Sequence, residues 1–175
     1  MNNLKGKNLL LRAPEPEDLD LLYIWENDPE IWQVSNTITP FSRYVLKNYI
    51  ENSHLDIFQS KQLRLMIELI NPSITVGTID LFDYDPYHNR AGIGILIGNV
   101  SERNKGYAGE ALDILISYSF KILKLHQLYC NISADNISSI GLFKSKKFVK
   151  CGEKKEWLKK TEGWQSEFLF QLIRQ

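Results

Sequence analysis

Residues 103–112 (RNKGYAGEAL) constrain the fold of this chain more than any other segment. An apolar, strand-like run ends just before them, and an amphipathic, helix-like run begins within them. A strand–loop–helix junction leaves backbone N–H groups unpaired in the first helical turn, at the positive end of the helix dipole. Gly106 and Gly109 let the backbone approach a bound molecule closely. The junction therefore predicts an anion-binding site at the start of the helix.

The hydrophobic pattern on both sides of this junction predicts a mixture of strands and helices. Apolar runs predict strands at residues 9–13, 63–70, 74–82, 91–98, 126–134, 148–150 and 164–173. Apolar residues at helical spacing predict helices over residues 42–52, 106–123 and 136–146, and one that opens at 14–18 and is stopped by 27–30. The junction follows three strands that read as an antiparallel meander. We therefore expect one α/β domain of the mixed (α+β) kind over residues 1–175.

Composition excludes several other classes of protein. The 175 residues are 43% hydrophobic and 24% charged, which suits an ordinary globular core. Lys and Arg (21) balance Asp and Glu (21), so net charge does not favour nucleic-acid or membrane-surface binding. No segment approaches the length of a membrane span, and the N-terminus lacks the apolar core of a signal peptide. Cys130 and Cys151 are too few for a disulfide framework or a metal cage. We expect a cytoplasmic protein with reduced thiols, no metal, and neither nucleic acid nor membrane as a partner.

Two familiar phosphate-binding motifs do not fit this sequence. The nucleoside-triphosphate loop requires Gly-x-x-x-x-Gly-Lys-Ser/Thr, which the chain lacks. The dinucleotide fingerprint requires Gly-x-Gly-x-x-Gly at a first strand–helix turn, whereas Gly92 and Gly94 lie inside a predicted strand. Glycines in a strand leave bare backbone against which another group can pack. The anion site expected at residues 103–109 is therefore neither of those two nucleotide-binding motifs.

The junction resembles the signature of the GNAT acetyltransferases. Arg103-x-x-Gly106-x-Ala108 matches that family's Gln/Arg-x-x-Gly-x-Gly/Ala motif. The strand at 91–98 and the segment at 136–148 are similar to the elements that flank the motif in the family, in the same order. This resemblance implies a mostly antiparallel central sheet with flanking helices and two splayed parallel strands.

The N-terminal part of the chain narrows the resemblance to one branch of that family. Leu11-Arg12, Glu17-Asp18, and Trp25 with residues 27–29 resemble the ribosomal-protein N-terminal and polyamine acetyltransferases. Together with the central motif, the similarity covers about the whole chain.

The resemblance implies that acetyl-CoA is the cosubstrate. The loop would hold its pyrophosphate through backbone N–H groups, and Asn136, whose amide both donates and accepts, would lie beside the thioester. The residues implied to contact the cofactor are Leu96, Ile97, Arg103, Asn104, Lys105, Gly106, Tyr107, Ala108, Gly109, Asn136, Phe143, Lys144 and Lys146. For the last two lysines, a solvated helix end is the alternative role.

The resemblance also implies a reaction, in which the acetyl group moves directly to a primary amine through a tetrahedral intermediate. The oxyanion would be met by a backbone N–H of the central strand, that of Ile97. Many relatives protonate the leaving thiolate with a Tyr where this chain has Phe143, and Phe cannot donate a proton. In the ribosomal-protein branch the proposed donor is a Ser three residues after the Asn, a place that Ser139 holds here. Helix capping is the alternative role of this serine.

The sequence leaves the general base open. An alkyl amine has a pKa near ~10.4, so a base or a water chain must help to deprotonate it at neutral pH. Relatives often carry Glu at the place of Gly92. Glu156 lies near, but not at, the position of a basic carboxylate in the N-terminal acetylating branch. Asp83, Asp85 and His88 form a second group of candidates after the third predicted strand.

Three functions remain for the acceptor side. Residues 32–41, which would line the acceptor cleft, contain no acid, so we expect a protein N-terminus or a small amine as the acceptor. Polyamine acetylation, with spermidine or a diamine, is the alternative, because Glu26, Asp28 and Glu30 lie nearby. A non-catalytic acyl-CoA-binding sensor is the second alternative, since the usual Tyr and Glu are replaced. The oligomeric state stays open, with a homo-oligomer among the possibilities.

Overall fold

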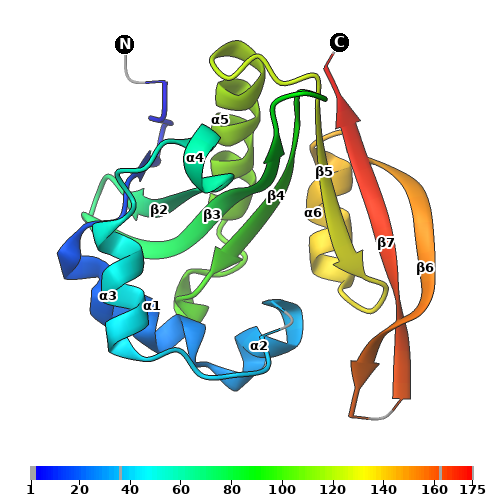
Figure 1. Ribbon diagram of the computed structural model, residues 1–175, viewed down its shortest axis with the longest axis horizontal. Coiled ribbons are helices and arrows are strands. Elements are labelled where there is room, and N and C mark those ends of the chain that lie inside the picture. The colour runs from blue at the N-terminus through cyan, green and yellow to red at the C-terminus, as the bar shows by residue number, and fades with distance from the viewer. Residues whose placement is uncertain (1–2, 36, 162, 175) are drawn as a thin grey trace.

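A single twisted sheet runs through the molecule, with strand order β1-β2-β3-β4-β5-β7-β6 (Figure 1). The computed structural model describes residues 3–35, 37–161 and 163–174. The strands are β1 (Leu9–Arg12), β2 (Leu63–Leu69), β3 (Ile74–Asp85), β4 (Arg90–Ile97), β5 (Gln127–Ser133), β6 (Val149–Lys160) and β7 (Gly163–Ile173). The helices are α1 (Leu19–Glu26), α2 (Pro29–Ser35), α3 (Arg43–Glu51), α4 (Ile57–Ser60), α5 (Tyr107–Lys121) and α6 (Ile137–Ser145), with short 3-10 turns η1 (Pro16–Asp18) and η2 (Val100–Glu102). The expected mixed α/β fold with a mostly antiparallel sheet is confirmed.

The parallel pair of strands is β4 and β5, and it is joined at one end only. Arg90 pairs with Gln127 and Gly92 with Tyr129, after which the ladder stops. Beyond these residues the two strands diverge (Figure 1), and we call the region between the diverging strands the wedge. The expected pair of splayed parallel strands is therefore confirmed. Among the described residues, no strand pairs with the N–H and C=O groups of β4 that face this wedge.

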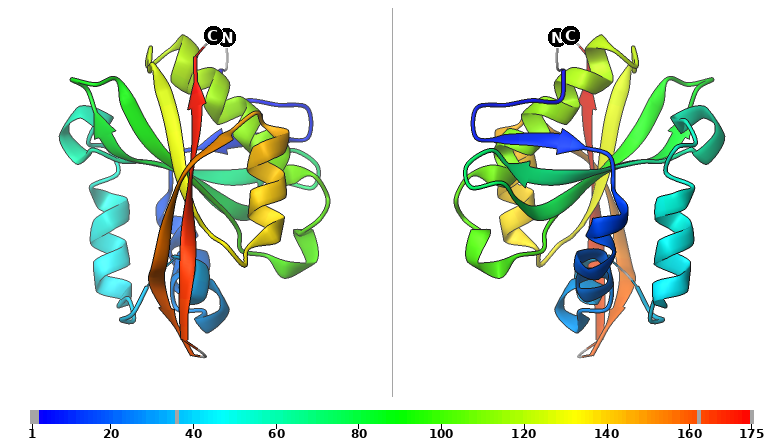
Figure 2. Two further views of the ribbon diagram at one scale, coloured as in Figure 1. Left: turned by 90° about the vertical axis from the view of Figure 1, so that its right-hand side faces the viewer. Right: turned by 90° about the vertical axis from the view of Figure 1, so that its left-hand side faces the viewer.

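Alternation along the strands gives the sheet two apolar faces. In β2, Leu65 and Ile67 belong to the main core beneath α5, whereas Met66 packs with Leu22 and Trp25 of α1. Figure 2 shows α3 and α4 on one side of the sheet and α5 and α6 on the other. We call the side of α1 and α3 the front face and the side of α5 and α6 the back face. No helix in the described parts of the chain has the length and apolar character needed to cross a membrane.

Helix α2 lies where the sequence analysis expected only the end of α1. The residues that end α1 also begin α2. Pro29 is allowed in a first helical turn, and the Asp28 carboxylate accepts from the Glu30 N–H at 2.8 Å. Part of the segment expected to line the acceptor cleft is therefore helical. Its residue 36 lies outside the described residues. The short helix α4 was also not expected, although Asp56 caps it through the Phe58 N–H at 2.9 Å.

Strand β6 is longer than the pattern suggested, whereas β7 forms where it was expected. The sequence predicted a closing strand at residues 148–150, but β6 continues to Lys160 and pairs with β7 along its length. Two register shifts, next to Cys151 and between Lys154 and Leu158, interrupt the alternation of apolar and polar residues. These bulges hid the strand from an analysis based on a period of two. Glu156 lies in the second bulge with φ of +50°.

Candidate functional site

A cavity of about 610 Å³ opens where β4 and β5 diverge. It is bounded by the end of β4, the loop before α5, the first turns of α5 and α6, and α2. The residues that line it are Glu30, Ile31, Ile95, Leu96, Ile97, Glu102, Arg103, Asn104, Gly106, Tyr107, Ala108, Gly109, Asn136, Ser138, Ser139 and Leu142. The structure thus brings nine of the thirteen residues expected at the cofactor, and one of the two expected catalytic residues, to one cavity.

The start of α5 presents free backbone N–H groups to this cavity. The first intrahelical bond is donated by Glu110 to the Gly106 carbonyl oxygen at 3.1 Å, so the N–H groups of Tyr107, Ala108 and Gly109 precede it. Within the described residues no side chain caps this helix end. The N-cap, Gly106, has φ of +85°, and a Cβ there would meet nothing within 4 Å. An open, uncapped helix start of this kind suits an anion.

Arg103 and Lys105 serve the shape of the loop. The Arg103 Nε donates to the Ile97 carbonyl oxygen at 3.0 Å, which ties the loop to the end of β4. Lys105 is exposed and pairs with Glu102 at 2.9 Å. Lys105 was expected among the cofactor contacts, but it does not line the cavity.

Asn136 and Ser139 meet at the start of α6. Asn136 is the N-cap of this helix, and its Oδ1 accepts from the Ser139 N–H at 3.1 Å. Capping therefore falls to Asn136, and the serine side chain is not needed for it. The Ser139 hydroxyl, in the part of the chain that the structure describes, has no hydrogen-bond partner. It lines the cavity and is available to a bound molecule.

Three other residues expected at the cofactor lie elsewhere. Phe143 is buried in the core and packs edge-to-face against Phe148, with ring centroids 5.1 Å apart, because the apolar side of α6 faces the sheet. Lys144 is exposed, and Lys146 pairs with Asp113 of α5 at 2.6 Å. None of the three lines the cavity, although Lys146 lies beside Gly109.

The bare backbone of β4 is covered by a ring from the neighbouring strand. A Cβ on Gly92 would lie 2.2 Å from the Phe82 ring, and one on Gly94 would lie 3.6 Å from it. The place where relatives carry Glu is therefore filled by Phe82. Glu156 does not compensate from its bulge in the outermost strand, because it is exposed and lines neither of the two cavities described in this structure.

An ionic cluster that sequence patterns did not indicate lies on the front face. Arg64 of β2 pairs with Asp80 of β3 at 2.7 Å and with Glu26 of α1 at 2.5 Å. The Tyr49 ring of α3 lies 5.4 Å from the Arg64 guanidinium, and burial raises the pKa of Tyr49 to about 12. The cluster joins β2, β3, α1 and α3. It therefore holds the C-terminal end of α1, from which the chain continues into α2. These residues are distant in sequence, and no local motif marks them.

The acetyltransferase (GNAT) domain family matches residues 8–149 of this chain. The chain therefore belongs to the GNAT acetyltransferases, enzymes that transfer an acetyl group from acetyl-CoA to an amine. The class inferred from the sequence is confirmed.

The relatives that this chain resembles include N-acetyltransferases from two bacteria. The N-acetyltransferase p20 of Bacillus licheniformis is 29% identical over 175 residues, which covers 99% of this chain and 97% of the relative. Spermidine N(1)-acetyltransferase of Vibrio cholerae is 26% identical over 147 residues, covering 84% and 82%. The crystal structure of spermidine N-acetyltransferase from Vibrio cholerae with CoA and spermine has a TM-score of 0.86 and 23% identity, covering 96% of each chain. This structure shares the fold.

Proposed function

We propose that the wedge between β4 and β5 binds acetyl-CoA and that the chain acetylates a primary amine delivered from the front face. The observation that carries this proposal is the meeting of three features in one cavity: the uncapped start of α5, the unpaired edge of β4, and the Asn136–Ser139 turn. The helix start suits an anion, the strand edge suits amide groups, and the turn offers polar side chains. Together they match a molecule that is anionic at one end and carries amides along its length.

The chain's own residues would hold acetyl-CoA as follows. The N–H groups of residues 107–109 face the pyrophosphate, where the dipole of α5 favours negative charge. The edge of β4 near Leu96 and Ile97 offers backbone N–H and C=O groups to the pantetheine amides, as an added strand would use them, apart from the Ile97 carbonyl oxygen that Arg103 already binds. When bound, acetyl-CoA supplies the thioester whose carbonyl carbon the amine attacks. Backbone N–H groups at the end of β4 would then stabilise the negative charge on its oxygen.

Ser139 is the stronger of the two catalytic candidates. Its hydroxyl lines the cavity and is not used in capping α6, so it can give a proton to the leaving thiolate. Glu156 is less favoured as the base, because the outermost strand holds it away from the cavity. Water in the cavity is the better candidate to take the proton from the amine.

The acceptor is a small primary amine or a protein N-terminus. A polyamine is the second candidate. The likeness to spermidine N(1)-acetyltransferase favours it, and so does the acidic residue Glu30, which lines the cavity. We further propose that residues 1–175 act as one domain in the cytoplasm. A homo-oligomer is consistent with a dodecameric spermidine N-acetyltransferase from Vibrio cholerae that has the same fold, with a TM-score of 0.78.

The direct test is an amine panel with detection of the free thiol of CoA. Peptides, polyamines, aminoglycosides and amino acids are each supplied with acetyl-CoA, and at least one amine should release CoA at a rate that saturates with its concentration. Thermal stabilisation by CoA without release of thiol for any amine would favour the sensor. Absence of both stabilisation and release would refute the cofactor site.

A further inference from the structure

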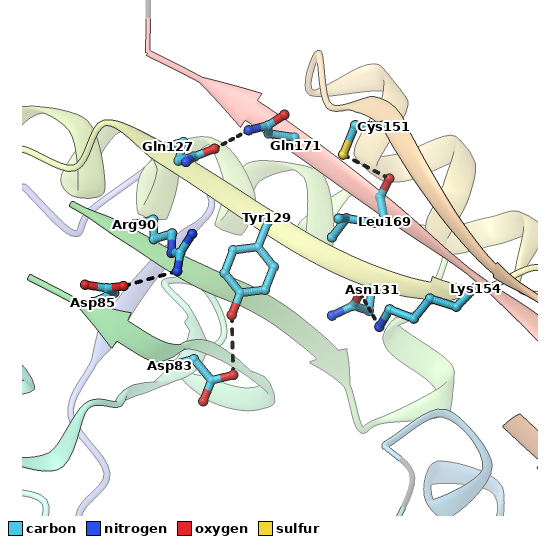
Figure 3. A pocket seen from close by; sticks show the side chains of 10 residues that line it. All are labelled: Asp83, Asp85, Arg90, Gln127, Tyr129, Asn131, Cys151, Lys154, Leu169 and Gln171. Atoms are coloured by element: carbon cyan, nitrogen blue, oxygen red, sulfur yellow. Dashed lines mark hydrogen bonds and ion pairs between the residues drawn. The ribbon is translucent and has the colours of Figure 1, made fainter. Parts of the chain in front are cut away.

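A second cavity, of about 650 Å³, lies on the front face beside the joined end of β4 and β5 (Figure 3). Its floor is formed by β5 and β7, one wall by the β3–β4 hairpin, and the other by β6. In β5, Gln127, Tyr129 and Asn131 point into this cavity, since they alternate with Leu128 and Cys130, which are buried in the back core. The cavity is polar and is distinct from the one between the splayed strands.

Most charges in this cavity are neutralised within it. Arg90 pairs with Asp85 at 3.2 Å, and Lys154 pairs with the buried Glu167 at 2.6 Å. Asp83 differs from them, because its carboxylate accepts only from the Tyr129 hydroxyl, at 3.3 Å, and has no cationic partner among the described residues. The cavity therefore carries one uncompensated negative charge, at the end formed by the β3–β4 hairpin.

The backbone of the hairpin directs this carboxylate toward the cavity. The register of β3 and β4 shifts between Phe82 and Asp85, and Asp83 adopts φ of +48° in the bulge. A bulge of this kind turns a side chain away from its regular direction. Burial, and next the negative charge of Asp83, raise the pKa of Tyr129, so its hydroxyl stays protonated and donates to the carboxylate.

One end of the cavity lies at the point where β4 and β5 begin to part. Pairing of β4 with β5 ends at Gly92 and Tyr129, and Asn131 is the next residue of β5 on the same face. Two residues of a strand advance about 7 Å. A molecule lying along β5 from Asp83 to Asn131 would therefore have one end at the carboxylate and the other where the strands part.

We propose that this second cavity selects amine acceptors that carry a second, protonated nitrogen. The reacting nitrogen enters the wedge beside Asn131, and Asp83 holds the distal ammonium group while Tyr129 orients the carboxylate. This inference rests on the proposed acetyl transfer and names the substrate class as diamines and longer polyamines. Asp83 acts on binding, and it does not contact the reacting atoms.

The test compares putrescine with butylamine, which share a four-carbon chain and differ in the second nitrogen. With the unmodified chain, kcat/KM should be at least about tenfold higher for putrescine. Asp83→Asn should raise the KM for putrescine about tenfold, and leave kcat, the KM for acetyl-CoA and the rate with butylamine unchanged. Asn is nearly the same size and tolerates a positive φ, so folding should be retained. Glu17→Gln, which removes an exposed carboxylate that lines neither cavity, should change none of these values.

The outcomes separate the two proposals. Equal use of the two amines by the unmodified chain, with no effect of Asp83→Asn, would overturn the role of the second cavity and leave acetyl transfer intact. Acetylation of other amines on the panel, but of neither of these two, would overturn it as well. Loss of all acetyl transfer, with every amine and with the unmodified chain, would refute the proposed function itself. Added salt should raise the KM for putrescine and leave that for butylamine unchanged, because screening weakens the attraction to Asp83.

Discussion

At the scale of single residues, turnover is expected to depend on the Ser139 hydroxyl. Asn136 caps α6, with its Oδ1 accepting from the Ser139 N–H at 3.1 Å, so removal of the hydroxyl should not loosen the helix. Ser139→Ala should lower kcat about 100-fold, as loss of a positioned general acid does, with little change in the Kd of CoA or in the melting temperature. Ser53→Ala, at an exposed serine that lines neither cavity, is the matched control and should behave as the unmodified chain. An unchanged kcat in Ser139→Ala would assign protonation of the thiolate to solvent.

Asn136 has a capping role in the fold and a proposed role at the cofactor. Its Oδ1 is used in the cap of α6, which leaves its N–H donors free on the side of the cavity. The sequence indicated a role for this residue at the cofactor through the family motif. It also gave helix capping as the alternative role of Ser139, and the structure assigns the cap to the asparagine instead.

At the scale of elements, β4 is shaped by the ring that lies against it. A Cβ on Gly92 would lie 2.2 Å from the Phe82 ring, so Gly92→Glu would force the ring to move. Overpacking of this kind costs about 1–3 kcal/mol, and the melting temperature of a chain of this length should fall by roughly 2–12 °C. Installing the carboxylate that relatives carry here should therefore lower stability without adding a base.

The double variant Phe82→Ala/Gly92→Glu tests this reason. If the clash causes the loss, removal of the ring makes room for the new side chain. The effects of the two changes on the free energy of unfolding should then be less than additive in thermal denaturation. Strictly additive losses would show that the ring and residue 92 do not interact.

The elements that local signals specify were predictable from the sequence. The strand before Gly106, the helix after it and the start of α6 each carry their own pattern, and all three form where expected. Helix α2 was hidden because Asp28 and Pro29 both end one helix and begin the next. Strand β6 was hidden by its bulges, which break the alternation of side chains.

The parts that were not predictable depend on contacts between distant segments. Arg64, Asp80 and Glu26 come together only once β2, β3 and α1 are packed. The contact of Phe82 with Gly92 requires the register of β3 with β4, and the second cavity requires five strands at once. Local periodicity contains none of this information.

At the scale of the whole molecule, an ion pair near the N-terminus gives stability a dependence on pH. Arg12 of β1 holds the buried Asp18 with two hydrogen bonds, of 2.7 and 2.9 Å, and the Glu15 N–H donates a third, of 2.8 Å. Burial alone would raise the pKa of Asp18, but these hydrogen bonds outweigh it and lower the pKa below its usual value. The unfolded chain therefore takes up this proton at a higher pH than the folded chain does.

The stability that this pair contributes is complete above about pH 4, the ordinary range of an Asp carboxyl, and is lost as the pH falls through the lower folded-state value. Asp18→Asn should cost about 2 kcal/mol near neutral pH, because Arg12 loses a charged partner, and should flatten the fall in stability below pH 4. Urea unfolding at a series of pH values measures both effects. Asp20→Asn, at an exposed residue, is the control, with an expected change within about 0.5 kcal/mol. If the free energy of unfolding of Asp18→Asn falls just as steeply below pH 4, the proton uptake belongs to other carboxylates.

The affinity for CoA of a matched pair of variants at residue 106 tests the central claim most directly. The N-cap has φ of +85° with open space around it, so Gly106→Asn and Gly106→Asp should both fold, and they differ only in charge. Isothermal titration with CoA should give a Kd for Gly106→Asn within about threefold of the unmodified chain, and a Kd at least about 100-fold weaker for Gly106→Asp, because its carboxylate would face the pyrophosphate. Equal affinity of the two variants for CoA would contradict a diphosphate at the start of α5.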